Sequence, residues 1–339
     1  MHAGTRGRGD AGTRGRGAPR AVRIIDSMLT LDAVATAAAL PWRALADAVA
    51  ATLADQSAGR AHVPERFVLP IDDGRAAWFV MPAWLDRGAG DIAMCKLITF
   101  HGDNPSAGRP AIQGDVIVVR ASTGERLAVV DGPTVTARRT AAVSALAAER
   151  LAPRRGPLLL IGAGVQGRAH AQAFAAVLGV REVLIASRSE TSARRLADEL
   201  ALDGLEARVA AGLGAALAQC PLVVTATTAA QVCLDGPLRD DAFVAAVGSF
   251  KPTMIELAPA LTRDIAARGR LVVDSDAARH EAGDLLQAGI DVAAVPTLSD
   301  VLQAPAAPPR GPVLFKSCGC ATWDLAAARC IASAIGRHT

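Results

Sequence analysis

A glycine-rich run is the first feature of this sequence that could do chemistry. Gly162, Gly164 and Gly167 follow an apolar run at residues 158–161 and precede a helical pattern that ends near residue 178. This order is typical of a dinucleotide-binding loop, where glycines permit a tight turn, a close approach to pyrophosphate and close helix packing. The free N–H groups at the helix start would bind the phosphates. The alternative is a glycine-rich turn without a ligand. The predicted cofactor contacts in this loop are Gly162, Ala163, Gly164, Val165, Gln166 and Gly167.

The residues after the next apolar run, 182–186, bear on which dinucleotide binds. A protein that prefers NAD commonly has an acidic residue there, which accepts hydrogen bonds from the ribose hydroxyls. Here the chain reads Ser187, Arg188, Ser189 and Glu190. Serine hydroxyls and a guanidinium can instead bind and neutralise a ribose phosphate. We therefore predict NADPH as the cofactor, with NADH possible because Glu190 could supply the missing acid.

These motifs need a scaffold, and the chain from residue 157 on predicts one. Strands and helices alternate there, with strands expected at residues 158–161, 182–186, 206–210, 222–227, 243–247 and 271–274. Several of these runs are continuously apolar, as in strands of a parallel sheet that is covered on both faces. The fold class predicted is α/β, with a doubly wound Rossmann sheet.

The preceding region predicts a smaller α+β unit. Alternating runs separated by turn signals indicate antiparallel strands at residues 67–71, 76–81, 92–99, 115–120 and 127–131. A strand is also expected at 22–25, a helix capped by Thr30 through residue 40, a helix from Pro41 to about 53, and a long helix at 137–150. An amphipathic helix at 322–335 follows the Rossmann region and could pack back on this first unit.

Composition limits the other function classes. The 339 residues predict about two domains at roughly 150 residues each, and 51% hydrophobic residues exclude wholesale disorder. Aromatic residues are only 3%, so stacking surfaces for single-stranded nucleic acid are scarce. Residues 1–20 carry five Arg and one Asp, a net charge of +4, which leaves −1 for the rest of the +3 total.

The basic tail is a near-duplicate, AGTRGRGD followed by AGTRGRGA, and is expected to be disordered. It could be a basic arm for nucleic acid or merely an extended start, and we favour the second. The six cysteines form no CxxC pair and have no histidine at zinc spacing. We therefore predict a cytoplasmic protein with reduced thiols, without a metal, a nucleic-acid partner or a membrane partner.

Eight sequence blocks resemble one known family in order and spacing. They are VPERFVLP (63–70), MPAW (81–84), KLITF (96–100), DGPTVTARRTAAVSALAA (131–148), GAGVQGRAH (162–170), AVGSFKP (246–252), HEAGDLL (280–286) and VLFKSCG (313–319). From about residue 22 to 334 the chain resembles the ornithine cyclodeaminase/mu-crystallin family. The resemblance implies a homodimer and a division into a tail (1–20), a discontinuous substrate-binding and dimerisation domain (21–150 with 316–339) and a Rossmann NADP-binding domain (151–315).

The family's activities include cyclodeamination, alanine dehydrogenation and ketimine reduction, so the site must discriminate among them. The cyclodeaminases carry an Asp that we align with Phe250, and a phenyl ring cannot accept a proton. The chain is most similar to bacterial ketimine reductases. The expected reaction is NADPH-dependent reduction of Δ1-pyrroline-2-carboxylate or Δ1-piperideine-2-carboxylate to L-proline or L-pipecolate. The alternatives are an ornithine or lysine cyclodeaminase and a non-catalytic binding protein.

The same resemblance assigns roles to individual residues. Arg66 and Lys96 would face a small cyclic imine carboxylate, and Arg139, rather than Arg138, would bridge it to the cofactor phosphates. Arg66 could instead be a surface charge paired with Glu65. Glu281 and Asp284 are candidates for ordering the imine or a proton-carrying water, while His101 and His280 are possible proton donors that could equally be structural. Further expected cofactor contacts are Thr140, Thr227, Thr228, Ala229, Val247 and Ser317.

Overall fold

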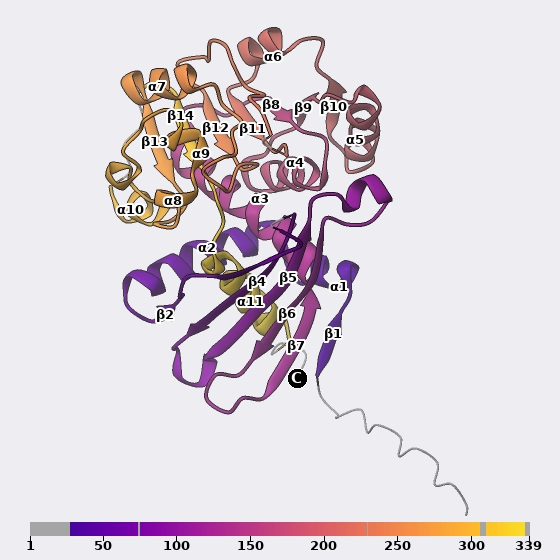
Figure 1. The fold of residues 1–339 in the computed structure, drawn as a ribbon, viewed down its shortest axis with the longest axis vertical. Helices are drawn as coiled ribbons and strands as arrows, with labels where there is room; N and C mark the ends of the chain where they lie inside the picture. The colour runs from indigo at the N-terminus through magenta and orange to yellow at the C-terminus, as the bar shows by residue number, and fades with distance from the viewer. Residues whose placement is uncertain (1–27, 74, 229, 306–309, 336–339) are drawn as a thin grey trace, which may run out of the picture.

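Two sheets organise the described part of the chain, which in this computed structural model comprises residues 28–335 except 74, 229 and 306–309. Figure 1 shows the first sheet below and the second above, with helices between them. The predicted tail at 1–20 and the strand predicted at 22–25 lie outside the described residues.

The first sheet is mainly antiparallel. Its strands are β1 (Leu29–Leu31), β2 (Ala61–His62), β3 (Phe67–Ile71), β4 (Ala76–Leu85), β5 (Ile92–His101), β6 (Ile112–Val119) and β7 (Arg126–Asp131). The order is β1-β7-β6-β5-β4-β2, with β3 paired to β4, and only the β1–β7 pairing among these is parallel. The five antiparallel strands predicted from the alternating pattern are therefore present, with longer β4 and β5 than expected. Two 3-10 turns, η1 (Gly88–Gly90) and η2 (Asn104–Ala107), lie in its loops.

Helices cover one face of this sheet: α1 (Ala33–Ala38), α2 (Trp42–Ser57), α3 (Gly132–Leu151) and the C-terminal α11 (Ala321–Ile335). The prediction that Thr30 caps the first helix was wrong. Thr30 lies in β1 opposite Val129, and Asp32 caps α1 by accepting a hydrogen bond from the Ala35 backbone N–H. As expected, α11 packs back on β4 and β5 of the first sheet.

Alternation along β4 separates the two faces of the first sheet. Phe79, Met81 and Ala83 are buried in the core beneath the helices, whereas Trp78 and Trp84 are exposed on the opposite face. Lys96 on β5 lies directly opposite Met81, and residues opposite one another point to the same face. The side chain of Lys96 is therefore carried to the helix-covered side.

The second sheet is parallel throughout. Its strands are β8 (Leu158–Ile161), β9 (Glu182–Ala186), β10 (Glu206–Val209), β11 (Leu222–Thr225), β12 (Phe243–Ala246), β13 (Arg270–Val273) and β14 (Val313–Lys316), in the order β10-β9-β8-β11-β12-β14-β13. β8 and β9 have the predicted bounds. β14 was not predicted as a strand and lies between β12 and β13. Lys316 pairs with Ala246 and Val273, so the expected domain boundary at 315/316 falls inside a strand.

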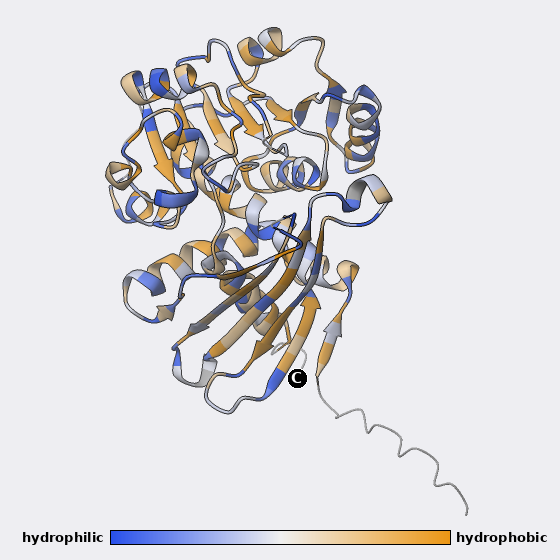
Figure 2. Ribbon diagram, viewed as in Figure 1, coloured by the Kyte–Doolittle hydropathy of each residue, from blue (hydrophilic) through white to orange (hydrophobic). Residues whose placement is uncertain are grey.

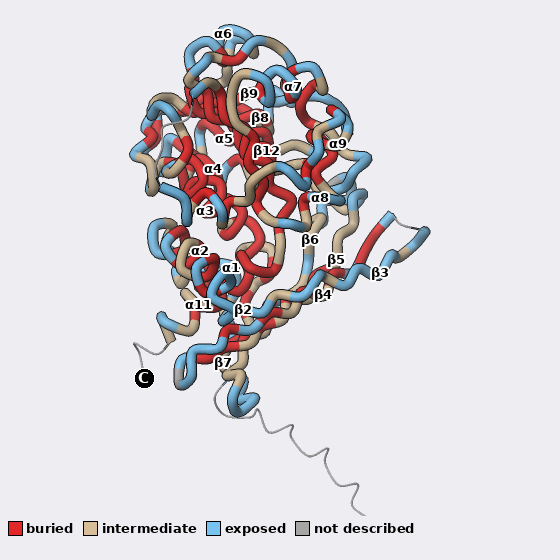
Figure 3. The backbone as a smooth tube through the Cα atoms, turned by 90° about the vertical axis from the view of Figure 1, so that its left-hand side faces the viewer, coloured by how far each residue is buried: buried red, intermediate tan, exposed pale blue. Residues whose placement is uncertain are grey.

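Helices cover both faces of the second sheet, which confirms the doubly wound prediction. The further elements are α4 (Val165–Leu178), α5 (Glu190–Leu202), α6 (Leu213–Gln219), α7 (Pro259–Arg268), α8 (Ala278–Glu281), α9 (Gly283–Leu286), η3 (Val292–Ala294) and α10 (Leu298–Gln303). In β8, Leu158 and Leu160 pack with α3–α5, while Leu159 and Ile161 pack with α6 and α7. These strands are mainly orange in Figure 2 and red in Figure 3, as expected for strands buried on both faces.

Candidate functional site

The glycine loop has the geometry that its sequence predicts. Gly162 has φ +124°, and a Cβ there would lie 2.3 Å from the Ala226 carbonyl oxygen. A Cβ on Gly167 would lie 2.2 Å from the Gly162 carbonyl oxygen. At Gly164, the N-cap of α4, a Cβ would meet nothing within 4 Å. Two glycines thus close the turn, and the third leaves open space at the helix start, which fits a pyrophosphate.

The end of β9 presents polar side chains, as predicted. Ser187 and Arg188 are exposed. Ser189 caps α5 by accepting a hydrogen bond from the Ser192 backbone N–H, so its hydroxyl also has a structural role. Glu190, the acid that could favour NADH, pairs with Arg194 at 2.6 Å within α5.

A buried carboxylate fixes the ends of β11 and β12. Glu256 has no exposed surface, and it accepts hydrogen bonds from the Thr225 hydroxyl, the Thr227 hydroxyl and backbone N–H, and the Gly248 backbone N–H at 2.7–2.9 Å. The predicted cofactor contacts Thr227 and Val247 lie on these fixed ends, and Thr228 is exposed beside them. Ala229 lies outside the described residues.

A second buried carboxylate, Asp274, holds the turn after β14. It accepts hydrogen bonds from the Ser317 hydroxyl (2.9 Å) and from the backbone N–H groups of Cys318 (3.0 Å) and Gly319 (2.7 Å). Ser317 is buried and its hydroxyl donates to Asp274, so it has a structural partner, and its contact with the cofactor stays a prediction. Gly319 has φ +83°, and a Cβ there would lie 2.8 Å from an Arg139 guanidinium nitrogen.

A cavity of about 880 Å³ lies where the two sheets face one another. From the first sheet and its helices it is lined by Arg66, Met81 and Trp323, and from the second sheet by Asp274 and Glu281. The backbone turn at residue 319 also borders it. This cavity therefore joins the predicted substrate residues to the strand ends of the Rossmann sheet.

Two of the three predicted substrate cations meet beside this cavity on one aspartate. Lys96 Nζ lies 2.8 Å from both carboxylate oxygens of Asp324, and Arg139 Nε lies 3.3 Å from Oδ1. Asp324 and Lys96 have no exposed surface. Burial is the main cause that lowers the pKa of Lys96 to about 8; Asp324 opposes this shift, and the charge of Arg139 adds to it.

The third cation, Arg66, pairs with Glu281 across the cavity. The alternative pairing with Glu65 is thus replaced by a contact between the two sheets. Burial raises the pKa of Glu281, and Arg66 opposes part of that shift. The second oxygen, Oε2, is buried without a hydrogen-bond partner among the described residues. Glu281 therefore has one oxygen available to a bound molecule.

Two further predicted residues, Asp284 and Thr140, have structural partners. Asp284 has no exposed surface and accepts hydrogen bonds from the Ser249 hydroxyl and the backbone N–H groups of Glu256 and Leu257; it also pairs with Lys316 at 3.2 Å. This geometry favours a structural role over the predicted one at the imine. The Thr140 hydroxyl donates to the Thr136 carbonyl oxygen. His280 is exposed and lines the cavity, whereas His101 ends β5 opposite Ala76.

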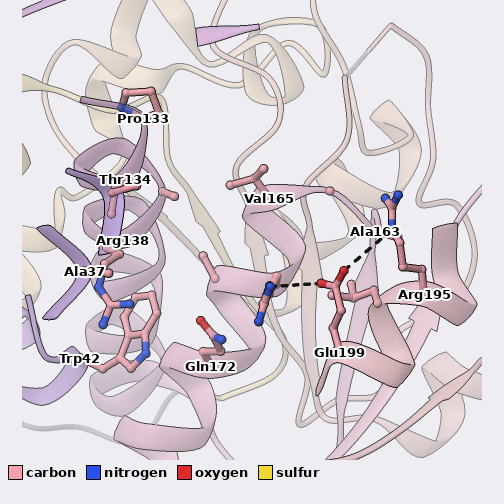
Figure 4. A pocket seen from close by; sticks show the side chains of 16 residues that line it. Ala37, Trp42, Pro133, Thr134, Arg138, Ala163, Val165, Gln172, Arg195 and Glu199 are labelled. Atoms are coloured by element: carbon pink, nitrogen blue, oxygen red, sulfur yellow. Dashed lines mark ion pairs between the residues drawn. The ribbon is translucent and has the colours of Figure 1, made fainter. Parts of the chain in front are cut away.

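Arg138 points to a different cavity, of about 570 Å³, between α3, α4 and α5 (Figure 4). Its guanidinium stacks on Trp42 at 3.7 Å and donates to the Leu40 carbonyl oxygen. The dashed lines in Figure 4 mark the ion pairs of Glu199 with Arg168 and Arg195. Adjacent helix positions face different directions, so the structure separates Arg138 from Arg139 as the sequence predicts.

The described residues contain neither a membrane-spanning helix nor a metal-binding cluster of side chains. No helix there is both long enough and apolar enough to cross a membrane. The same residues contain no group of three or more His, Cys, Asp or Glu side chains arranged to hold a metal ion.

The sequence reasoning missed the carboxylates that hold the site together. Asp324, Asp274 and Glu256 were not predicted, although all three are buried. Asp324 had one available signal, because it is an acid in the otherwise apolar first turns of the last helix. A buried acid of this kind needs a cationic partner.

The parallel sheet and its glycine loop define a protein of the dinucleotide-binding Rossmann class. The model of the ornithine cyclodeaminase/mu-crystallin family matches residues 26–337. The chain therefore belongs to this family, as the eight sequence blocks predicted.

Relatives of known name agree with this assignment. The chain is 42% identical to Δ1-pyrroline-2-carboxylate reductase 1 of Burkholderia multivorans, over 88% of this chain and 93% of the relative. It is 35% identical to the mouse ketimine reductase mu-crystallin, over 79% and 83% of the two chains. The Thermococcus litoralis Δ1-pyrroline-2-carboxylate reductase, solved with NADH and L-proline, has a TM-score of 0.84 at 24% identity over 92% and 98%, a likeness that shows the fold.

Proposed function

We propose that this protein reduces cyclic ketimine carboxylates with NAD(P)H, converting Δ1-pyrroline-2-carboxylate or Δ1-piperideine-2-carboxylate to L-proline or L-pipecolate. The observation that carries this proposal is a group of cations, one lining the 880 Å³ cavity and two buried beside it. Arg66, Lys96 and Arg139 supply three positive charges against two carboxylates, Glu281 and Asp324. Lys96 and Arg139 share a single carboxylate, Asp324, as counter-ion, which favours binding of a second carboxylate beside them.

The substrate carboxylate would lie against Lys96 and Arg66, with Arg139 between it and the cofactor. A buried carboxylate is stable only with charge-assisted partners, and fixing it also fixes the adjacent imine carbon. The dinucleotide supplies a hydride to that carbon when it is bound at the glycine loop. The imine nitrogen must gain a proton, and we place Glu281 Oε2, which has no hydrogen-bond partner among the described residues, where it would order the imine or a water that carries the proton.

We propose NADPH as the preferred form of the cofactor. Ser187 and Arg188 are exposed at the end of β9, and Glu190 is paired with Arg194. Replacing Arg188 with Ala should raise the KM for NADPH about tenfold, the value of one exposed charge-assisted contact to phosphate, and change the KM for NADH little. Arg181→Ala, which removes an exposed arginine just before β9, serves as control. Equal effects on both cofactors would contradict the NADPH assignment.

The main experiment follows NADPH absorbance with each cyclic imine as substrate. Lys96→Ala should lower kcat/KM by at least about a hundredfold, since it removes a buried charge-assisted contact. Lys251→Ala is the matched control, because Lys251 is exposed. Wild-type protein that oxidises no NADPH with either imine would refute the proposal.

Cyclodeamination is the second candidate, and the structure disfavours it at one position. Phe250 packs edge-on against Phe100, with ring centroids 6.1 Å apart, so a hydrocarbon occupies the place of the expected acid. Release of ammonia from L-ornithine or L-lysine without net use of NADPH would establish this activity instead. A non-catalytic binding protein would bind NADPH but turn over none of these substrates.

We also propose a homodimer formed through the outer face of β3 and β4. Phe67 and Leu69 on β3 and Trp78 and Trp84 on β4 are large, apolar and exposed there, Phe67 to 58%. Leu69 lies opposite Trp78, so these side chains share one face. A contiguous apolar surface of this kind on a sheet is typical of an interface between subunits.

Light scattering after size-exclusion chromatography tests the dimer. The wild-type protein should elute as a dimer, and Trp78→Lys should shift it toward monomer by burying an unpaired charge in the interface. Val34→Lys places the same charge on α1, where Val34 is 79% exposed, and should leave the dimer intact. A wild-type monomer would exclude this interface.

A further inference from the structure

The buried contact of Asp324 with two site cations is not explained by stability alone. Asp324 lies in the first turn of α11 and has no exposed surface. Its two oxygens are equidistant from Lys96 Nζ at 2.8 Å, and Oδ1 is also 3.3 Å from Arg139 Nε. A buried ion pair commonly contributes little net stability, because desolvation offsets the Coulomb attraction. Its location, between two residues of the proposed site, indicates another role.

The geometry around Arg139 restricts its guanidinium from the opposite side. Gly319 lies so close that a Cβ would be 2.8 Å from one guanidinium nitrogen and 3.2 Å from the other. Asp274 fixes the Gly319 backbone by a hydrogen bond of 2.7 Å. Arg139 is therefore held between Asp324 and a rigid turn, with its end at the cavity wall that residue 319 forms.

Lys96 depends on Asp324 for its charge. It is fully buried on β5 and is also close enough to Arg139 and Arg66 to be affected by both positive charges. Burial and these two cations disfavour the ammonium form, and Asp324 is the group that favours it. Without the Asp324 carboxylate, Lys96 would lose its proton at a lower pH and could not pair with a substrate carboxylate.

We propose that Asp324 is a positioning residue for the reduction proposed above, on which this inference rests. It holds the Lys96 ammonium and the Arg139 guanidinium at fixed places, one for the substrate carboxylate and the other between substrate and cofactor. The C-terminal helix thereby contributes to catalysis without contacting the substrate.

The test compares Asp324→Asn with wild type in kcat/KM for the imine across pH 6–10. Asn keeps the size of the side chain and removes its charge. The expected result is a loss of about tenfold to a hundredfold at neutral pH, the value of one buried charge-assisted contact. In wild type, kcat/KM should fall on the alkaline side as Lys96 loses its proton near pH 8. This alkaline limb of the pH profile should move to lower pH by about one unit in Asp324→Asn. Ionisation of the imine itself is common to both proteins, so the difference reports on the enzyme.

Two further variants separate positioning from general damage. Asp324→Glu keeps the negative charge, so the alkaline limb of its pH profile should lie at the wild-type pH. Its kcat/KM can still be lower than that of wild type, because the longer side chain displaces the two cations. Asp55→Asn makes the same change at another fully buried aspartate, which pairs with Arg60, Arg87 and Arg329; none of these four residues lines the cavity. It should lower stability and leave the alkaline limb in place. An Asp324→Asn enzyme with an unmoved limb overturns the positioning role while the reductase proposal stands.

A measurement without turnover keeps the two proposals distinguishable. Pyrrole-2-carboxylate is a planar ring acid that cannot accept a hydride, and its binding can be followed by calorimetry in the presence of NADP+. Asp324→Asn should weaken this binding about tenfold or more, and Asp324→Glu should weaken it less. If the variants differ in binding as expected but the wild-type protein reduces no imine, the reductase proposal is refuted and the positioning role of Asp324 is retained. Should Asp324→Asn fail to fold, a wild-type alkaline limb in Asp324→Glu supports the role and a displaced limb contradicts it.

Discussion

Acid should loosen the contact between the helix that carries Arg139 and the helix that follows the glycine loop. His170 on α4 is fully buried, with Nδ1 2.7 Å from the Gln166 carbonyl oxygen and Nε2 3.0 Å from the Ser144 hydroxyl on α3. A carbonyl oxygen only accepts, so Nδ1 of the neutral ring carries the proton, and Nε2 is an acceptor that competes with the Thr140 carbonyl oxygen, 3.3 Å away, for the Ser144 hydroxyl proton. Burial lowers the pKa of this imidazole from 6.5 to about 4, because the charged form would be desolvated.

The sign and size of the effect follow from this shift. The folded-state pKa lies below the unfolded value, so the free energy of unfolding is unaffected above pH 6.5 and falls between pH 6.5 and pH 4, where only the unfolded chain takes up the proton. At about 1.4 kcal/mol per pKa unit, the loss is about 1 kcal/mol at pH 5.5 and roughly 2–3 kcal/mol at pH 4.5. Carboxylates add their own acid dependence, so the prediction concerns the difference between wild type and a variant that cannot titrate.

Urea unfolding followed by tryptophan fluorescence at pH 7.5, 5.5 and 4.5 measures this difference, since Trp323 is fully buried. His170→Gln should be less stable than wild type at pH 7.5, because it loses packing at α3. The difference in the free energy of unfolding between wild type and His170→Gln should become smaller by roughly 2–3 kcal/mol at pH 4.5. His280→Gln removes an exposed imidazole as the control. A constant gap between wild type and His170→Gln across this range would refute the argument.

Three other substitutions test stability and cofactor binding. Asp55→Asn should lower the free energy of unfolding by about 3 kcal/mol, the lower end for breaking a buried ion pair. The loss is at the lower end because Arg60 and Arg87 are nearly half exposed. Urea titration measures this loss, and a change under about 1 kcal/mol would contradict the prediction. Gly167→Ala should cost about 1–3 kcal/mol through its clash. Gly164→Ala should leave stability unchanged and weaken NADPH binding at least about tenfold, as seen by fluorescence titration; unaltered binding would exclude a phosphate at this turn.

The strands of the parallel sheet were predictable where an apolar run is bounded by turn residues in the local sequence. β8 and β9 are apolar runs that end in a glycine loop and a polar turn, and their bounds were correct. β14 has the same apolar character over Val313–Lys316, yet its place between β12 and β13 depends on pairings with strands 70 and 43 residues earlier, such as Lys316 with Ala246 and Val273. Local pattern carries no information on that choice.

The sequence singled out the cations of the candidate site and one of their counter-ions, Glu281, but not Asp324, with which Lys96 and Arg139 pair. Lys96 ends an apolar run and lies in a family block, so its type and position indicated a role. Asp324, Glu256 and Asp274 are acids in sequence contexts that would equally suit the surface, and only the fold shows that each is buried. Which carboxylate meets which cation is decided by packing between segments as distant as β5 and α11.

Two of these buried acids, Asp274 and Asp324, also explain how one short segment serves both sheets. β14 completes the Rossmann sheet, and the chain then passes through the turn that Asp274 holds, places Gly319 against Arg139 and enters α11, where Asp324 meets Lys96. An apolar core between the sheets would be at least as stable as these ion pairs. It would not hold cations at the wall of a cavity that must bind an anion. The cost of burying these charges is therefore best understood as part of building the site.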